Sequence, residues 1–286
     1  MSKTYTMGLD IGSTTIKVVV MDENDEIIYK EYRRHLSNIR LIMAELLKET
    51  YEKIGNINTR VCVTGSGGLM ISKWLDIAFV QEVVAGTVAV EALIPLTDCA
   101  IELGGEDAKI TFFEGNIEQR MNGTCAGGTG AFIDQMATLL KTDAAGLNEM
   151  AKTHTTIYPI ASRCGVFSKT DIQPLLNEGA AKSDIAASIF QAVVNQTISG
   201  LACGHPIRGN VAFLGGPLFF LSELRARFVE TLKLEEEQVI FPKGSNLFVA
   251  IGAAYASEKY KPVELKDLVE RVQNTDTITA SEVGRL

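Results

Sequence analysis

Asp10-Ile11-Gly12-Ser13-Thr14-Thr15 joins two short apolar runs, Thr4–Asp10 and Thr15–Met21, near the start of the chain. Runs of this length that are rich in Val, Ile and Thr predict β-strands, and the Gly-Ser pair between them predicts a tight hairpin turn. Such turns are common in ordinary hairpins, but glycine also lets backbone N–H groups approach a phosphate closely. Further donors to phosphate oxygens are available on Ser13, Thr14, Thr15 and Lys17.

A second stretch of this kind is Glu102-Leu103-Gly104-Gly105-Glu106-Asp107, between the predicted strands Cys99–Leu103 and Ala108–Phe113. The order strand, glycine turn, strand, acidic turn, strand thus occurs twice. This duplication predicts two related α/β units rather than one continuous sheet. Each glycine turn carries a carboxylate at the end of its first strand, Asp10 or Glu102. Two such turns fit a cleft between domains that holds Mg²⁺ and a polyphosphate.

A third glycine turn, Leu214-Gly215-Gly216-Pro217, follows the predicted strand Asn210–Leu214 and precedes a predicted helix. We expect the base and ribose of a nucleotide to lie there, because glycine leaves room for close approach. The other expected strands are Glu26–Tyr32, Arg60–Thr64 and Ile117–Met121. The expected helices are Ile39 to about Lys53 with Asn38 as its cap, Glu82–Leu93, Ala131–Leu140, Ala144–Ala151, Ser183–Leu201, Pro217–Thr231 and Leu247–Tyr260.

Two cysteines lie among small, loop-forming residues: Cys125 in Asn122-Gly-Thr-Cys-Ala-Gly-Gly-Thr-Gly130 and Cys164 in Ser162-Arg-Cys-Gly-Val-Phe167. A helical pattern follows the first segment directly. Cys125 is therefore expected at a helix N-terminus, where the helix dipole favours a thiolate. Two thiolates are too few for a metal cluster, but two chains related by a two-fold axis supply four. Four thiolates hold either a [4Fe–4S] cluster or Zn²⁺, and the residues alone leave both open.

Composition narrows the possible partners and the compartment. The chain has 286 residues, 46% of them hydrophobic, and a net charge of −8 with no basic block. Nucleic acid and anionic membrane surfaces are therefore unlikely partners. The apolar stretches are expected to be too short and too interrupted by glycine to span a bilayer, and the N-terminus does not resemble a signal peptide. Five cysteines without paired spacing indicate a reducing cytoplasm rather than a disulfide framework.

The remaining cysteines and histidines have simpler interpretations. Cys62 and Cys99 lie in apolar runs and are expected to be small buried side chains. Cys203 and His205 could form a metal pair, although this spacing usually has no function. The other two histidines, His35 and His154, are expected to be solvated.

Taken in order, the three glycine turns resemble those of the actin/hexokinase/heat-shock-chaperone ATPase superfamily. The two cysteine segments narrow the resemblance to the activators of 2-hydroxyacyl-CoA dehydratases and the related ATPase subunits of benzoyl-CoA reductases. The similarity covers roughly residues 5 to 260. It implies an α/β fold with two ribonuclease-H-like, actin-like ATPase domains and a nucleotide cleft between them. It also implies a homodimer with one [4Fe–4S] cluster between subunits, from which ATP drives an electron into a partner at low potential.

The resemblance also implies residue roles and partners. Asp10 and Glu102 are expected to be catalytic, and Cys125 and Cys164 to bind the cluster. The partners implied are an Fe–S acceptor, such as an acyl-CoA dehydratase or a related reductase, and a ferredoxin or flavodoxin as donor. Residues expected to bind ATP or ADP with Mg²⁺ are Gly12, Ser13, Thr14, Thr15, Lys17, Gly104, Gly105, Asp107, Gly128, Gly130, Gly215 and Gly216.

One departure from the superfamily pattern is Glu102, where Asp is usual, so that the carboxylate is one methylene further from the backbone. The expected domains are 1–97 with 247–262, and 98–246, which holds the cysteines. Residues after about 261 are polar and have no expected partner strand. We therefore expect residues 263–286 to be a linker or a truncated tail. An alternative function is an ATPase or small-molecule kinase of the same superfamily with structural or zinc-binding cysteines.

Overall fold

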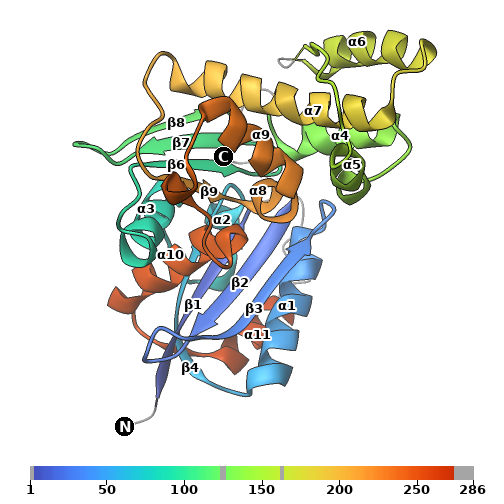
Figure 1. Cartoon of the computed structure of the whole chain (residues 1–286). Coiled ribbons are helices and arrows are strands. Elements are labelled where there is room, and N and C mark those ends of the chain that lie inside the picture. The colour runs from blue at the N-terminus through green and yellow to red at the C-terminus, as the bar shows by residue number, and fades with distance from the viewer. Residues whose placement is uncertain (1–2, 123–126, 162–163, 274–286) are drawn as a thin grey trace, which may run out of the picture. The chain divides into compact units, whose positions relative to one another are not determined.

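The structure, a computed structural model, describes residues 3–122, 127–161 and 164–273 (Figure 1). The chain divides into two compact units, Met1–Ala92 with Leu247–Leu286 (unit 1) and Leu93–Asn246 (unit 2). Each unit has a mixed sheet of its own, with one of the two predicted hairpins at its centre. The prediction of two related α/β units is confirmed.

The sheet of unit 1 has the order β11-β4-β1-β2-β3, with β5 paired to β4. β1, β2 and β3 are antiparallel neighbours, whereas β1 and β4 run in parallel. In this register Asp10 is opposite Lys17 on one side and Thr64 on the other. The strands are β1 (Thr4–Ile11), β2 (Thr15–Met21), β3 (Ile27–Arg34), β4 (Asn58–Thr64), β5 (Ala78–Phe79) and β11 (Val263–Glu264).

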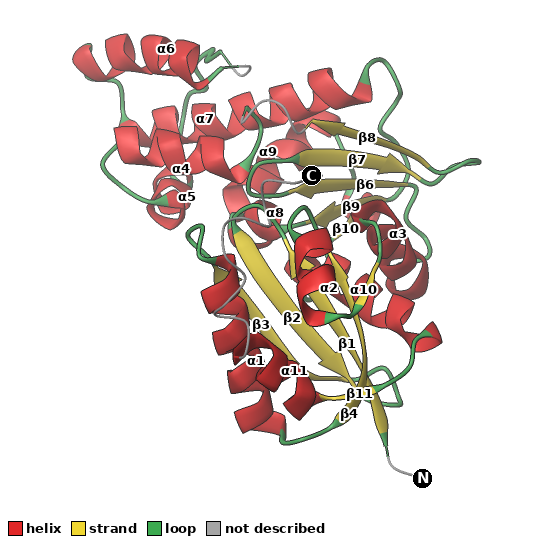
Figure 2. Cartoon of the chain, turned by 180° about the vertical axis from the view of Figure 1, so that it is seen from behind, coloured by secondary structure: helices red, strands yellow, loops and turns green. Residues whose placement is uncertain are grey.

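Helices pack on both faces of this sheet (Figure 2). Alternate β1 residues such as Met7 and Leu9 pack with α1, α2 and α11. On the opposite face α10 approaches β1 so closely that a Cβ on Gly8 would overlap the carbonyl of Ala250. The helices of unit 1 are α1 (Ile39–Ile54), α2 (Gly68–Leu75), α3 (Glu82–Leu93), α10 (Phe248–Ala256) and α11 (Leu265–Gln273).

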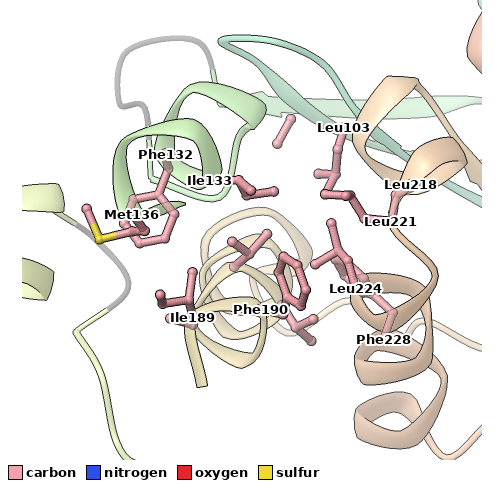
Figure 3. Packing of buried hydrophobic residues seen from close by; sticks show 14 of the residues in the cluster. Leu103, Phe132, Ile133, Met136, Ile189, Phe190, Leu218, Leu221, Leu224 and Phe228 are labelled. Carbon is pink, nitrogen blue, oxygen red and sulfur yellow. The ribbon is translucent and has the colours of Figure 1, made fainter. Parts of the chain in front are cut away.

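The sheet of unit 2 has the order β10-β9-β6-β7-β8. Its core is built from apolar side chains of β6, α4, α7, α8 and α9, which converge between the helices (Figure 3). The strands are β6 (Cys99–Leu103), β7 (Ala108–Phe112), β8 (Glu118–Asn122), β9 (Val211–Leu214) and β10 (Val239–Ile240). The helices are α4 (Gly130–Leu139), α5 (Ala144–Ala151), α6 (Gly165–Asn177), α7 (Lys182–Thr197), α8 (Gly216–Phe220) and α9 (Ser222–Leu232).

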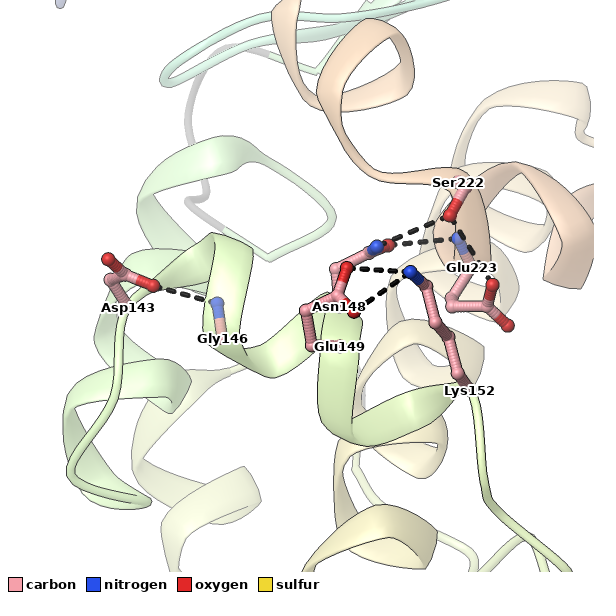
Figure 4. Close-up of polar contacts among 7 residues, drawn as sticks. All are labelled: Asp143, Gly146, Asn148, Glu149, Lys152, Ser222 and Glu223. Atoms are coloured by element: carbon pink, nitrogen blue, oxygen red, sulfur yellow. Dashed lines mark hydrogen bonds and ion pairs between the residues drawn. The ribbon is translucent and has the colours of Figure 1, made fainter.

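Polar side chains fix α5 and α9 within unit 2 (Figure 4). Asp143 caps α5 by accepting the N–H of Gly146 at 2.7 Å. Asn148 of α5 accepts the N–H of Glu223 at 2.9 Å and donates to the hydroxyl of Ser222 at 3.2 Å. One side chain thus satisfies a free N–H group at the N-terminus of α9.

Several expected helices differ from those observed. The predicted helix 217–231 is two helices, α8 and α9, which meet at Leu221 in an extended conformation. The helix expected at 183–201 is α7 followed by a π-helical turn, Ile198–Ala202. Asn38 precedes α1 as predicted, but its side chain makes no capping hydrogen bond. Three helices, α2, α6 and α11, are not predicted at all.

The expectation that the chain has no partner strand after residue 261 is wrong for residues 263–273. Val263 and Glu264 form β11, which pairs with β4, and α11 follows. The apolar side chains of α11 are buried in unit 1, and Leu265 and Leu268 are fully buried there. The polar composition of the segment conceals a strongly amphipathic helix. Residues 274–286 lie outside the described part of the chain.

One helical stretch, Lys182–Ala202, has the length and composition of a membrane span, with a mean hydropathy of 1.2. The expectation that every apolar stretch is too short is therefore wrong for these 21 residues. Two thirds of the window (67%) is buried inside the protein. This is the environment of a core helix in a globular unit.

Candidate functional site

The first predicted turn places a buried ion pair at its edge. Asp10 lies near the end of β1, and only 2% of its surface is exposed. Lys17, opposite it on β2, donates from Nζ to Oδ2 at 2.7 Å. The turn is closed by the N–H of Gly12, which donates to the carbonyl of Thr15 at 2.9 Å. Among the described residues, the N–H groups of Ser13 and Thr14 have no hydrogen-bond acceptor.

Two buried oxygens beside this turn have no partner among the described residues: Oδ1 of Asp10 and Oγ1 of Thr64. They belong to register partners on β1 and β4, whose side chains point to the same face of the sheet. Leaving a buried polar atom unsatisfied costs about 1–3 kcal/mol, so such atoms usually bond water or a ligand. Carboxylate and hydroxyl oxygens suit Mg²⁺, directly or through its waters. The two unpartnered oxygens therefore fit the Mg²⁺ ion of a bound magnesium nucleotide.

A glycine loop that the sequence analysis missed also lies at this position. Gly65 follows β4 with φ of +90°, and a Cβ there would be 2.6 Å from Oδ1 of Asp10. The N–H of Gly67 donates to the carbonyl of Ile11 at 2.9 Å. The signal was available, because Gly65, Gly67 and Gly68 follow directly after a buried strand.

The second turn repeats the arrangement in unit 2, with an added carboxylate. Lys109 is opposite Glu102 in the β6–β7 register, as Lys17 is opposite Asp10. Its Nζ lies 3.5 Å from Glu102 Oε1 and 2.5 Å from Asp107 Oδ2, and only 3% of its surface is exposed. The sequence analysis missed Lys109, although it follows Glu102 at the same spacing of seven residues as Lys17 follows Asp10.

Four of the predicted glycines come together in unit 2. The N–H of Gly130, the first residue of α4, donates to the carbonyl of Gly104 at 3.0 Å. The next N–H of α4, that of Ala131, donates to Gly105 at 2.7 Å. Gly215 has φ of +89° and lies so close to β6 that a Cβ would overlap the carbonyl of Leu103. The N-terminus of α4 is therefore bonded to the second turn, and the third turn lies against it.

Two predicted glycines have other neighbours. Gly128 is in the left-handed region with φ of +82°, and a Cβ there would be 3.3 Å from Gln196 and from Thr197 of α7. Gly216 is buried at the start of α8. Gly215 also donates its N–H to the carbonyl of Ser245 at 3.1 Å, and the hydroxyl of Ser245 is buried without a partner among the described residues.

Of the two predicted cluster ligands, Cys125 lies outside the described residues. Cys164 is half-buried at the N-cap of α6, with a free thiol. A free, partly exposed cysteine of this kind can serve as one metal ligand. In residues 3–122, 127–161 and 164–273, no group of three or more His, Cys, Asp or Glu side chains could hold a metal ion.

The remaining cysteines behave largely as expected, but one histidine does not. Cys62 and Cys99 are buried, and burial raises their pKa values to about 11 and about 12. Cys203 is exposed near His205. His35 is only 4% exposed, so the expectation that it is solvated is wrong. The sequence around it is polar, and its burial follows from contacts with the first turn.

Comparison with known proteins identifies the relatives of this chain. Residues 7–257 match the BadF/BadG/BcrA/BcrD ATPase family. The 2-hydroxyisocaproyl-CoA dehydratase activator of Clostridioides difficile is 31% identical over 264 residues, 90% of this chain and 96% of that protein.

Two solved structures are also similar. One is the Acidaminococcus fermentans (R)-2-hydroxyglutaryl-CoA dehydratase component A, with a TM-score of 0.77 and 28% identity over 90% of this chain and 98% of that one. The other is the activator of the 2-hydroxyisocaproyl-CoA dehydratase from Clostridium difficile with bound ADPNP. Its TM-score is 0.76 and its identity 27%, over 96% of this chain and 100% of that one. These similarities confirm the predicted α/β, actin-like fold class.

Proposed function

Because the chain belongs to the BadF/BadG/BcrA/BcrD ATPase family, we propose that it is an ATP-dependent activator that reduces an Fe–S acceptor at low potential. The acceptor proposed is a 2-hydroxyacyl-CoA dehydratase or a related reductase. The similar proteins, each named as an activator or component of such a dehydratase, support this class of acceptor. The observation that carries the proposal is the pair of hydrogen bonds from the start of α4 to the carbonyls of Gly104 and Gly105.

ATP is proposed to bind with its phosphates on the glycine turns. Lys17 supplies a positive charge, and Asp10 with Glu102 orients Mg²⁺ and the attacking water. The unpartnered Oδ1 of Asp10 supports this role, because it is preorganised to accept one more bond. The other residues proposed to contact the nucleotide are Gly12, Ser13, Thr14, Thr15, Gly104, Gly105, Asp107, Gly128, Gly130, Gly215 and Gly216.

The cluster ligands are proposed to be Cys125 and Cys164 from each of two chains in a homodimer. A [4Fe–4S] cluster held by them would supply a one-electron carrier. The position of Cys164 at the N-cap of α6, half-buried and with a free thiol, supports this assignment. The domain that contains both cysteines is proposed to be 98–246. The proposed electron donor is a ferredoxin or a flavodoxin.

We propose that α4 couples the nucleotide site to the cysteine segment, because it is connected to both. It begins just after the Cys125 segment, and its first N–H groups are bonded to the second turn. A change in the nucleotide on that turn therefore moves the acceptors of these bonds. We propose that ATP binding shifts α4 in this way and that hydrolysis and product release reverse the shift.

Anaerobic purification tests the proposal. The expected result is a brown dimer with about two iron atoms per chain, since four thiolates from two chains hold one four-iron cluster. Cys164→Ser and Cys125→Ser should each abolish the visible absorbance and leave ATP binding largely intact, because other segments build the nucleotide site. Cys203→Ser, an exposed cysteine, is the matched control. A colourless protein with zinc would overturn the electron-transfer role and support an ATPase or kinase instead.

A further inference from the structure

His35 is buried against the turn that we propose to bind phosphate. It follows β3, and its backbone N–H donates to the carbonyl of Thr14 at 3.1 Å. Its ring Nε2 lies 3.1 Å from the carbonyl oxygen of Gly12. One histidine therefore contacts two of the three carbonyls on the Gly12–Thr14 turn.

The third contact determines where the ring carries its proton. The N–H of Ser37 points at Nδ1 from 3.1 Å, so Nδ1 accepts and has no proton. In a neutral imidazole the proton then lies on Nε2, which donates to the Gly12 carbonyl. The ring thus presents one donor to the turn and one acceptor to its own chain.

The backbone after His35 is shaped around this ring. Leu36 and Ser37 have φ of 46° and 66°, in the left-handed region that non-glycine residues seldom adopt. Such conformations persist where the surroundings hold them. Here the N–H of Asn38 closes the bend by donating to the carbonyl of His35 at 2.7 Å. The bend places the N–H of Ser37 under Nδ1 and keeps the ring in one orientation.

We propose that His35 is a positioning residue for nucleotide binding, an inference that rests on the proposed function. The carbonyl of Gly12 and the N–H of Ser13 belong to one trans peptide, so they point in opposite directions. Holding that carbonyl against Nε2 directs the N–H of Ser13 away from His35. The N–H is then preorganised to donate to a phosphate oxygen.

Two substitutions separate the two ring contacts. In His35→Gln the amide nitrogen can take the place of Nε2 and donate to Gly12. In His35→Asn the amide oxygen can take the place of Nδ1 and accept from Ser37, as in an Asx turn. If the role is positioning, Gln should preserve nucleotide affinity and Asn should not. If His35 only stabilises its own bend, Asn should be the better replacement.

The experiment measures binding of Mg·ATP to the full chain by calorimetry, with thermal unfolding in parallel and His154→Ala as a control histidine in unit 2. We expect His35→Ala and His35→Asn to raise the dissociation constant about tenfold, the scale of one lost hydrogen bond. His35→Gln should stay within about threefold of the wild type. Wild-type affinity in both His35→Ala and His35→Asn would overturn this inference but not the proposed function. Weaker binding of Mg·ATP by His35→Gln than by His35→Asn would do the same. Failure of the wild-type chain to bind Mg·ATP would overturn the proposed function as well.

Discussion

Asp10 differs from an ordinary buried carboxylate because its two oxygens have unequal environments. Oδ2 accepts from Lys17, while Oδ1 has no partner among the described residues. Lys17 thus occupies one oxygen of this buried carboxylate and leaves the second oxygen available. This asymmetry suits a group that orients a metal ion or a water rather than one that only stabilises the fold.

Asp10→Asn should therefore lower ATP hydrolysis by about 100-fold or more, the scale of one positioned catalytic group. The affinity for ATP should change far less, because other groups contact the phosphates. Steady-state hydrolysis and calorimetry measure the two effects. The control is Asp25→Asn, the same change at an exposed turn of unit 1. Wild-type turnover in Asp10→Asn would remove Asp10 from the mechanism.

Lys109→Met should destabilise the protein by about 1–3 kcal/mol, because it leaves the partly exposed carboxylates of Glu102 and Asp107 without their shared buried cation. Urea unfolding measures the loss. Adding Asp107→Asn to this variant should recover part of it, since one uncompensated charge is removed. The control is Lys152→Met, which breaks an exposed pair with Glu149 (Figure 4) and should cost under about 1 kcal/mol. Equal losses in the two lysine variants would contradict the argument.

At the residue scale, the sequence predicted those features that depend on neighbouring residues in the chain. The turn at Gly12 and the carboxylates at the ends of β1 and β6 are readable from glycine, charge and β-branched residues in sequence. Thr64 and Lys109 were missed because their importance depends on the register of strand pairing. His35 was missed because its burial results from contacts with a turn more than 20 residues earlier in the chain.

At the scale of elements, residues 155–161 are held by side chains rather than by a sheet. Asp184 of α7 accepts the N–H groups of Thr155 and Thr156 at 2.7 and 3.2 Å. Ser188, one turn further, accepts the N–H of Tyr158 at 2.8 Å. From α6, Asp171 accepts the N–H of Ala161 at 2.7 Å. These bonds fix the path of the chain toward the start of α6.

The pKa of Asp184 is lowered from its ordinary value of 3.8, chiefly by the N–H of Thr155 and also by that of Thr156. Its contribution to stability is therefore present above pH 3.8 and lost as the pH falls through the lower, folded-state pKa. Urea midpoints from pH 7 to pH 2 should fall more steeply for the wild type than for Asp184→Asn, which does not titrate. Asp25→Asn should follow the wild type. Parallel curves for the wild type and Asp184→Asn would show that the charge of Asp184 contributes nothing to stability.

Element prediction failed for particular physical reasons. The helix α6 contains Pro174 and buries only Ser168 and Ile172, so it shows little helical periodicity. The helix α11 was taken for a tail because its apolar residues are spaced among charges, although their spacing matches one buried face. By contrast, β2, α3, β6 and α5 begin and end as predicted.

At the scale of the whole molecule, the start of α4 connects the proposed nucleotide turns with the segment that contains Cys125. Two adjacent N–H groups of α4, those of Gly130 and Ala131, are bonded to the second glycine turn. Gly130 also lies against Pro217 at the third turn, where a Cβ would be 3.3 Å from the proline ring. A helix start that is bonded to the second glycine turn and packed on the third can transmit a change at either.

If this connection transmits the nucleotide state, an iron chelator should remove iron from the anaerobically prepared protein faster with ATP bound than with ADP. Gly130→Ala should reduce the difference, because a Cβ would be 3.2 Å from the carbonyl of Gly104, a tight contact that shifts one segment slightly from the other. Gly86→Ala is the control, since a Cβ there meets nothing within 4 Å. Chelation followed by visible absorbance in the ATP, ADP and empty states measures the effect. Identical rates in all three states of the wild type would mean that nucleotide binding and the cysteine segment are not coupled, and the chain would then be an ATPase that carries iron without controlling its exposure.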